Sequence, residues 1–166
     1  MLKAKPLIFF LDSATVDLGD VDLVDLKNQG NLVLHNKRAG DSLPREAGKA
    51  EVVISNKYPL GPEEMDRLPA LKLIAVAATG TNNVDLAAAR RRGVAVCNVP
   101  GYSTATVVEH ALMMLLAFSH RLTEHVEAVR VGEWSRSPWF AVLSFPFSDL
   151  AGKTLGILGY GDIGKR

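Results

Sequence analysis

Cysteine is nearly absent from this sequence of 166 residues, which contains one thiol, Cys97. A single cysteine cannot form a disulfide within the chain, so the small disulfide-stabilised scaffolds of secreted proteins are excluded. The apolar surroundings of Cys97, GVAVCNVP, predict a buried and reduced thiol rather than a catalytic one. The cysteine content therefore favours a cytoplasmic protein.

Long apolar segments and an excess of one charge are also lacking. The most apolar helical stretch, residues 111–118, is far too short to cross a bilayer. The N-terminal apolar run ends at Asp12 and carries no small-residue cleavage site, so no secretory signal is predicted. Nineteen basic and eighteen acidic residues give a formal net charge of +1. This balance gives no electrostatic reason to expect a nucleic-acid partner or a membrane surface.

Five short apolar runs, rich in β-branched residues, alternate with segments of helical or turn character. They lie at residues 7–12, 31–35, 51–55, 71–78 and 93–99. Runs of Val, Ile and Leu without polar alternation are typical of parallel strands whose two faces are both covered by helices. The sequence therefore predicts an α/β fold built on a doubly wound parallel sheet.

Helical signals differ in strength along the chain. The stretch after the fourth run is predicted to form a helix that Asn83 caps and Gly93 ends. The longest helical pattern extends over residues 104–131, and its apolar arc is broad enough to be buried on more than one side. The segment KTLGILG, at 153–159, predicts one further β-strand.

The closing residues, GYGDIGKR, fit two phosphate-binding patterns. They match G-x-G-x-x-G through Gly159, Gly161 and Gly164, and also the first seven positions of G-x-x-x-x-G-K-[ST]. The second pattern requires a hydroxyl at its eighth position, where this sequence has Arg166. A strand pattern before the glycines and a helix beginning near Ile163 favour a dinucleotide-binding turn over an incidental one. The acidic residue that would identify the ribose lies about twenty residues further on, so NAD and NADP both stay open.

Three separated stretches occur in a distinctive order. They are LKLIAVAATGTNNVDLAAARRRGVAVCNVPGYSTATVVEHALMMLLA, then GEW, then LAGKTLGILGYGDIGKR. Together they resemble the D-isomer-specific 2-hydroxyacid dehydrogenases, and the resemblance extends over residues 7–166. The SNKY sequence at 55–58 is similar to the glycerate dehydrogenase and hydroxypyruvate reductase branch. The resemblance implies a flavodoxin-like, doubly wound substrate domain at 1–101, followed at 102–166 by a linking helix and the start of a Rossmann dinucleotide-binding domain.

The resemblance also implies roles for particular residues. Successive N–H groups in the turn at Ala78, Thr79 and Gly80 would hold the substrate carboxylate, although the same turn also serves as a strand-to-helix connection. Asn56 and Lys57 would line the substrate cleft, with a solvated loop lysine as the alternative. The residues implied in cofactor binding are Thr104, Gly159, Gly161, Asp162, Ile163 and Gly164. For Thr104, the alternative is a simple helix N-cap, formed by Thr104 itself or by its neighbour.

The activity that the resemblance implies is hydride transfer between a nicotinamide cofactor and a small 2-oxo or D-2-hydroxy acid, in a homodimer. The family's catalytic arginine, acidic residue and histidine follow the glycine turn, so the chain is expected to be the front part of a longer enzyme. No catalytic residue is assigned here, and the chain alone is expected to be inactive. The pair His120 and Glu124 has metal-ligand spacing but no further ligand, so no metal site is expected. The alternative function is a nucleotide-sensing or corepressor-like binding module on the same fold.

Overall fold

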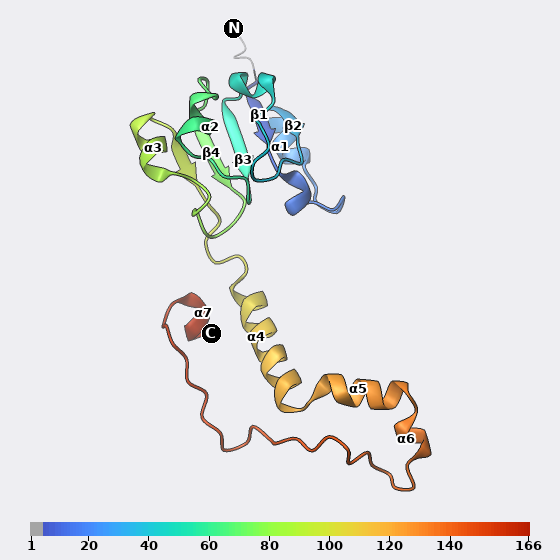
Figure 1. The fold of residues 1–166 in the computed structure, drawn as a ribbon. Helices are drawn as coiled ribbons and strands as arrows, with labels where there is room; N and C mark the ends of the chain where they lie inside the picture. The colour runs from blue at the N-terminus through green and yellow to red at the C-terminus, as the bar shows by residue number, and fades with distance from the viewer. Residues whose placement is uncertain (1–4) are drawn as a thin grey trace. The chain divides into compact units, whose positions relative to one another are not determined.

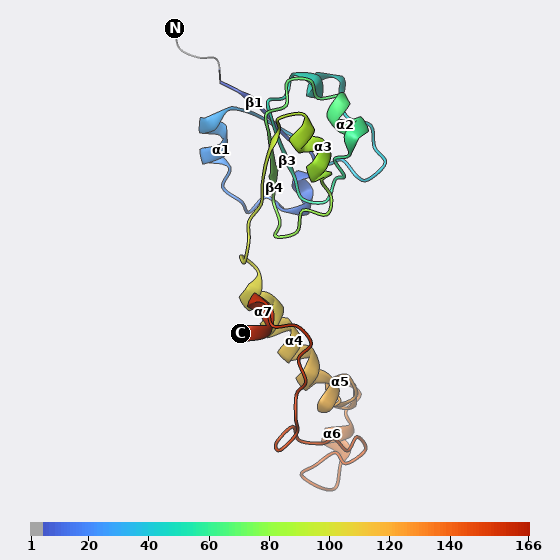
Figure 2. The same cartoon turned by 90° about the vertical axis from the view of Figure 1, so that its left-hand side faces the viewer.

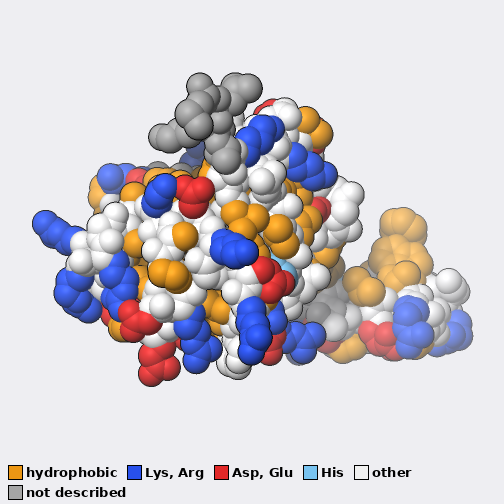
Figure 3. Space-filling model, turned by 90° about the horizontal axis from the view of Figure 1, so that it is seen from above, with side chains coloured by type: hydrophobic (Ala, Val, Ile, Leu, Met, Phe, Trp, Pro, Cys, Tyr) orange, Lys and Arg blue, Asp and Glu red, His pale blue; other side chains and the backbone are white. Residues whose placement is uncertain are grey.

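The structure, a computed structural model, describes residues 5–166. The chain divides into two compact units, Met1–Pro100 and Gly101–Arg166, which are considered separately (Figure 1). No helix in the described part of the chain is long and apolar enough to cross a membrane. On the face of the molecule shown in Figure 3, basic and acidic side chains are interspersed with apolar ones rather than segregated by sign.

A five-stranded parallel sheet forms the centre of the first unit. Its strand order is β2-β1-β3-β4-β5, the order of flavodoxin-like folds. The strands are β1 (Leu7–Phe10), β2 (Asn31–Leu34), β3 (Val52–Ser55), β4 (Leu73–Val76) and β5 (Ala95–Cys97). Each strand lies within one of the five apolar runs, so the predicted α/β fold with a parallel sheet is confirmed.

Short helices connect these strands. They are η1 (Ser13–Thr15), α1 (Val24–Gln29), η2 (Arg45–Lys49), α2 (Pro62–Asp66) and α3 (Leu86–Arg91). The α3 helix is capped by Asp85, whose carboxylate accepts a hydrogen bond from the Ala88 N–H at 2.8 Å. The prediction that Asn83 is this cap is wrong, because the helix begins at Leu86 and the residue directly before it is Asp85. The Asn83 side-chain NH2 group instead donates to the Tyr58 carbonyl. Gly93 follows the helix with φ of +67°, in the left-handed conformation that its predicted role requires.

The two faces of the sheet are covered unequally. One face contributes Phe9, Val53 and Ile74, all fully buried, to a large core that includes residues of η2, α2 and α3. The other face has a smaller cluster around Ile8 and Ile54, with α1 packed against it. Figure 2 shows α1 on one side of the sheet and α2 and α3 on the other. The sheet is therefore wound on both sides, but more completely on one.

The thiol of Cys97 lies on the less covered face. Cys97 is paired with Ala75 at the end of β5, one of the two edge strands, and it is exposed. The predicted burial of this thiol is wrong, because an apolar sequence does not reveal that a strand lies at the edge of its sheet.

The second unit consists of helices and irregular segments. The helices are α4 (Thr104–Ser119), α5 (Leu122–Arg130), α6 (Glu133–Arg136) and α7 (Asp162–Lys165). The prediction of one helix over 104–131 is wrong, because Arg121 adopts a left-handed conformation with φ of 51° and separates α4 from α5. No residue of α4 is buried within the described chain, although its apolar arc predicts burial.

The predicted strand over 153–159 is not formed in the described chain. A strand is stabilised by hydrogen bonds to a neighbour, and the only sheet among residues 5–166 belongs to the first unit. The apolar side chains of this segment are consequently exposed, including Ile157 and Leu158. A periodic apolar pattern is thus not sufficient for a strand without a partner to pair with.

Candidate active site

The carboxyl ends of β1, β3 and β4 lie at one edge of the sheet, and the loops that follow them concentrate buried polar groups. The buried polar residues among those described are Asp12, Ser13 and Ser55, and all three lie at this edge. Because apolar residues dominate the rest of the core, such clustering marks a place where polar groups are needed. Ligands of open parallel sheets bind outside the carboxyl ends of the strands, so this edge is the candidate substrate site.

The turn after β4 presents free N–H groups. The carbonyl of Ala78 accepts from the Val99 N–H at 3.0 Å, and the carbonyl of Thr79 accepts from the Asn98 amide at 2.6 Å. Within residues 5–166, the N–H groups of Ala78, Thr79 and Gly80 donate no hydrogen bond. A Cβ added to Gly80 would meet no atom within 4 Å, so the turn is open there. Three consecutive free N–H groups form a suitable concavity for a carboxylate.

The loop after β3 uses its two predicted residues differently. The Asn56 side-chain amide donates to the Thr15 hydroxyl at 3.0 Å and to the Thr15 carbonyl at 3.3 Å, so it fixes the loop to the chain after β1. The Lys57 side chain is exposed and takes part in none of the ion pairs of the described chain. Lys57 is therefore the free cation of this loop, and Asn56 keeps one side-chain oxygen for a ligand.

Asp12 is the residue of this edge that was not predicted. Its carboxylate accepts hydrogen bonds from the N–H groups of Asn56 at 2.9 Å, Lys57 at 2.5 Å and Tyr58 at 2.9 Å. Asn83, in the loop after β4, connects that loop to the loop after β3, since its side-chain amide donates to the Tyr58 carbonyl at 3.2 Å. The available signal was an acidic residue directly after the apolar run LIFFL, at the carboxyl end of a predicted strand.

Two ionisable groups near this edge have shifted pKa values. Burial, followed by the nearby Glu64 and Asp41, raises the pKa of the Tyr58 hydroxyl, which donates to the Asp41 carbonyl at 2.7 Å. Burial, followed by the positive charge of Lys37, lowers the pKa of His35, whose ring is stacked on Phe9. Both shifts favour the neutral form, so neither group adds charge to the site at neutral pH.

The glycine turn of the second unit is formed locally. Gly159 has φ of +108°, which favours glycine, and Gly161 precedes α7 as its N-cap. A Cβ on Gly164 would overlap the carbonyl oxygen of Gly159, whereas a Cβ on Gly161 would meet no atom within 4 Å. The three glycines therefore supply a tight turn, an open backbone and a close approach, the three functions that a dinucleotide turn requires.

The other predicted cofactor residues lie at helix starts in the same unit. Thr104 begins α4, and Ser103, which precedes it, makes no side-chain capping bond. Asp162 and Ile163 are the first two residues of α7. An apolar cavity of about 570 Å³ lies between α4 and the segment 155–166. The glycine turn and the start of α4 thus belong to one unit, and the predicted substrate residues belong to the other.

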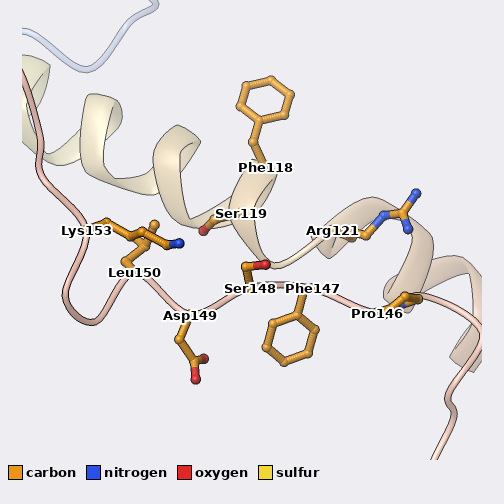
Figure 4. A pocket seen from close by; sticks show the side chains of 9 residues that line it. All are labelled: Phe118, Ser119, Arg121, Pro146, Phe147, Ser148, Asp149, Leu150 and Lys153. Carbon is orange, nitrogen blue, oxygen red and sulfur yellow. The ribbon is translucent and has the colours of Figure 1, made fainter.

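A second depression in this unit, of about 540 Å³, lies where α4 meets α5 (Figure 4). Its side chains do not converge: Phe118 points to one side of the chain, while Phe147 and Asp149 point to the other. Sites for small ligands bring a few polar groups to one point. We therefore do not assign this depression as an active site.

The histidine and glutamate with metal-ligand spacing have other partners. The His120 ring packs on Phe147 with ring centroids 4.6 Å apart. The Glu124 carboxylate accepts from the Arg121 guanidinium at 3.1 Å. In the described part of the chain, no group of three or more His, Cys, Asp or Glu side chains is arranged to hold a metal ion.

Comparison with known proteins assigns most of the chain, including nearly all of the sheet, to one family. Residues 8–156 match the family "D-isomer specific 2-hydroxyacid dehydrogenase, catalytic domain". The chain belongs to this family. The family resemblance inferred from the sequence motifs is thereby confirmed.

Individual proteins that are similar to this chain have names that agree with the family match. Glycerate dehydrogenase from Methylorubrum extorquens is 44% identical over 116 residues, which are 70% of this chain and 37% of that protein. D-lactate dehydrogenase from Aquifex aeolicus, solved with NAD and lactic acid, is 28% identical with a TM-score of 0.76, over 96% of this chain and 46% of that one. An NADPH-dependent glyoxylate/hydroxypyruvate reductase from Sinorhizobium meliloti, solved with NADP and malonate, is 25% identical with a TM-score of 0.75, over 98% and 48%. This chain thus spans between 37% and 48% of the length of these three relatives.

Proposed function

We propose that the whole protein is an NAD- or NADP-dependent oxidoreductase that interconverts 2-oxo acids and D-2-hydroxy acids of the glycerate, hydroxypyruvate or glyoxylate class. The observation that carries this proposal is the row of free N–H groups at Ala78, Thr79 and Gly80, on the carboxyl edge of the sheet. The names of the relatives support the substrate class, since they include a glycerate dehydrogenase and a glyoxylate/hydroxypyruvate reductase.

The two units have separate tasks in this proposal. Residues 1–101 form the substrate domain, and residues 102–166 form a linking helix and the start of the dinucleotide-binding domain. The flavodoxin-like sheet supports the first assignment, and the glycine turn supports the second.

The substrate domain binds and orients the acid. The substrate carboxylate accepts hydrogen bonds from the free N–H groups at Ala78, Thr79 and Gly80, while Lys57 attracts the anion from the neighbouring loop. Asn56 lines the same site through its side-chain oxygen. These contacts fix the carboxylate, and a fixed carboxylate restricts the orientations that the neighbouring carbonyl carbon can adopt for reduction.

The residues of the glycine turn fit a dinucleotide. The open backbone at Gly161 receives the diphosphate, with Gly159 and Gly164 shaping the turn. Asp162 and Ile163 follow at the start of α7, and Thr104 contributes from the start of α4. When bound, a nicotinamide cofactor supplies the hydride, and the protein supplies binding and orientation.

We assign no residue of this chain to proton transfer or to polarising the substrate carbonyl. The 166-residue chain alone is therefore expected to be inactive. The exposed apolar side chains of α4, such as Leu112 and Leu116, each about half exposed, support the proposal that the whole protein is a homodimer that covers this helix.

The proposal is tested by supplying hydroxypyruvate and glyoxylate to the whole protein with NADH or NADPH. With one or both substrates, we expect the cofactor to be oxidised, which is measured as the loss of NADH or NADPH absorbance. The 166-residue chain serves as a control in which no turnover is expected. Failure to reduce any small 2-oxo acid would defeat the proposal, and dinucleotide binding without turnover would favour the nucleotide-sensing alternative.

A further inference from the structure

Asp12 stands out because it is a buried carboxylate without a cationic partner. It is 1% exposed, and none of the ion pairs formed by residues 5–166 includes it. Its oxygens instead accept hydrogen bonds from three consecutive N–H groups, those of Asn56, Lys57 and Tyr58. A buried carboxylate is costly unless such bonds compensate it, so an acidic residue at this position requires a specific reason.

The place of this carboxylate in the fold suggests the reason. In the strand order 2-1-3-4-5, β2 is added on one side of β1 and the later strands are added on the other side, so the strand order reverses between β1 and β3. Flavodoxin-like folds bind ligands at the carboxyl ends of these two strands. Asp12 follows β1, and the N–H groups that it engages follow β3. The chain's own carboxylate therefore occupies an anion-binding concavity that an external anion would otherwise fill.

The loop that Asp12 holds is itself hydrogen-bonded to the turn after β4. The Asn83 amide donates to the Tyr58 carbonyl at 3.2 Å and to the Ser55 hydroxyl at 3.3 Å. The Leu60 N–H donates to the Asn83 carbonyl at 2.7 Å. Through these bonds, the loop that Asp12 holds is connected to the turn with the free N–H groups.

We propose that Asp12 is a positioning residue for substrate binding, which acts by holding the loop at Asn56, Lys57 and Tyr58. We call the Asp12 carboxylate and these three N–H groups the Asp12 clamp. The clamp closes the concavity after β3 to external anions, so the N–H groups after β4 are left as the site for the substrate carboxylate. It also fixes the backbone of Lys57 in the loop next to that site. This inference rests on the proposed function, because it assigns Asp12 a role in binding the same acid substrate.

The main variant is Asp12→Asn, which preserves size but replaces one acceptor oxygen with a donor that faces backbone N–H groups. In the 166-residue chain, hydrogen exchange at Asn56, Lys57 and Tyr58 is expected to accelerate by at least about 10-fold. Exchange in the core, at Val53, is expected to change much less. In the whole protein, the KM for hydroxypyruvate is expected to rise about 10-fold with kcat within about 2-fold, since a binding contact is weakened.

The matched control is Asp17→Asn. Asp17 also accepts three backbone N–H bonds, from Gly19 at 2.7 Å, Asp20 at 3.1 Å and Val21 at 3.2 Å, but in an exposed loop. These bonds, that from Gly19 first, lower the pKa of Asp17. This variant is expected to leave KM and kcat unchanged. An effect seen only in Asp12→Asn is then specific to the position of Asp12, and is not a general result of removing a carboxylate that accepts backbone hydrogen bonds.

A second variant keeps the test valid if Asp12→Asn does not fold. Thr15 is exposed, donates to the Asp12 carbonyl at 2.7 Å and accepts from Asn56 at 3.0 Å. Thr15→Val removes both bonds without entering the core, and it is expected to raise KM about 3-fold with kcat unchanged.

The outcomes separate this inference from the proposed function. Faster exchange in the loop together with a higher KM supports a positioning role. Faster exchange with unchanged KM, or unchanged exchange, overturns the positioning role and leaves the dehydrogenase proposal intact. If Asp12→Asn does not fold, an unchanged KM in Thr15→Val overturns the positioning role instead. Absence of turnover in the unaltered whole protein overturns the proposed function, and this inference with it.

Discussion

Replacing Phe9 with alanine is expected to lower the free energy of unfolding of the first unit by about 4 kcal/mol. Phe9 is fully buried in β1, which pairs with both β2 and β3 and so lies inside the sheet. Its ring also stacks on His35, with ring centroids 4.9 Å apart. Domains of ordinary size are stable by only about 5–15 kcal/mol, so this single change would remove a large part of the total.

Hydrogen exchange measures this loss in the first unit alone. Protection at Val53 and Ile74, buried in β3 and β4, reports the opening of the core, and the change in protection converts directly to free energy. Leu18→Ala is the control, because Leu18 is apolar, lies in the same unit and is 90% exposed. The control is expected to change stability by less than about 0.5 kcal/mol. A loss below about 1 kcal/mol for Phe9→Ala would contradict the packing described here.

The second large effect concerns Gly164. Replacing it with alanine is expected to lower the affinity of the whole protein for NAD or NADP by about 100-fold, equivalent to roughly 2.8 kcal/mol. The added Cβ would overlap the carbonyl oxygen of Gly159. The Cβ is fixed rigidly to the backbone and the oxygen is a backbone atom, so no flexible side chain can move away to relieve the overlap, and the turn must open. An opened turn no longer directs its N–H groups at a diphosphate.

Gly161→Ala provides the comparison for this variant. Its Cβ would meet no protein atom within 4 Å, so the turn should keep its conformation in the 166-residue chain. Binding of the dinucleotide by the whole protein should still weaken, because the methyl group stands where the diphosphate approaches. Backbone chemical shifts in the short chain and calorimetric titration of the whole protein separate the two effects. Unchanged shifts at Gly159 in Gly164→Ala would contradict the close approach.

The sheet could be predicted because its signals are local. Each buried strand is a short run of β-branched and other apolar residues, such as VVIS at 52–55, flanked by turn residues. The same rule failed at 153–159, where the pattern is equally apolar but no strand pairs with it. Strand formation depends on a neighbour distant in sequence, and the pattern of one segment carries no information about that neighbour.

The break between α4 and α5 is not marked in the sequence by proline or glycine, the residues that usually end a helix. Residues 104–131 contain neither proline nor glycine, and the left-handed residue is Arg121. Local context offers a partial reason, since the Arg121 guanidinium is bonded to Glu124 one turn into α5 and lies 5.9 Å from the ring of Phe145. That second contact joins residues 24 positions apart, so propensity within the helix could not predict it.

The candidate site was only partly predictable for the same reason. The turn at Ala78, Thr79 and Gly80 could be located because it follows a strand and belongs to a family motif. Asp12 was missed because its partners are 44 to 46 positions away and are backbone groups, which leave no mark in the sequence. The sequence predicts Asn83 as a helix cap, but Asp85, two residues later, provides that cap. Residue type and spacing thus locate loops, whereas the bonds between loops require the fold.

The most direct test of this account is a crystal structure of the whole protein with NADH and D-glycerate, a reduced cofactor and a hydroxy acid that cannot react with each other. We expect the glycerate carboxylate within hydrogen-bond distance of the N–H groups of Thr79 and Gly80, and the diphosphate against the backbone of Gly161. A carboxylate bound elsewhere, with the N–H groups of Thr79 and Gly80 facing solvent, would contradict the account.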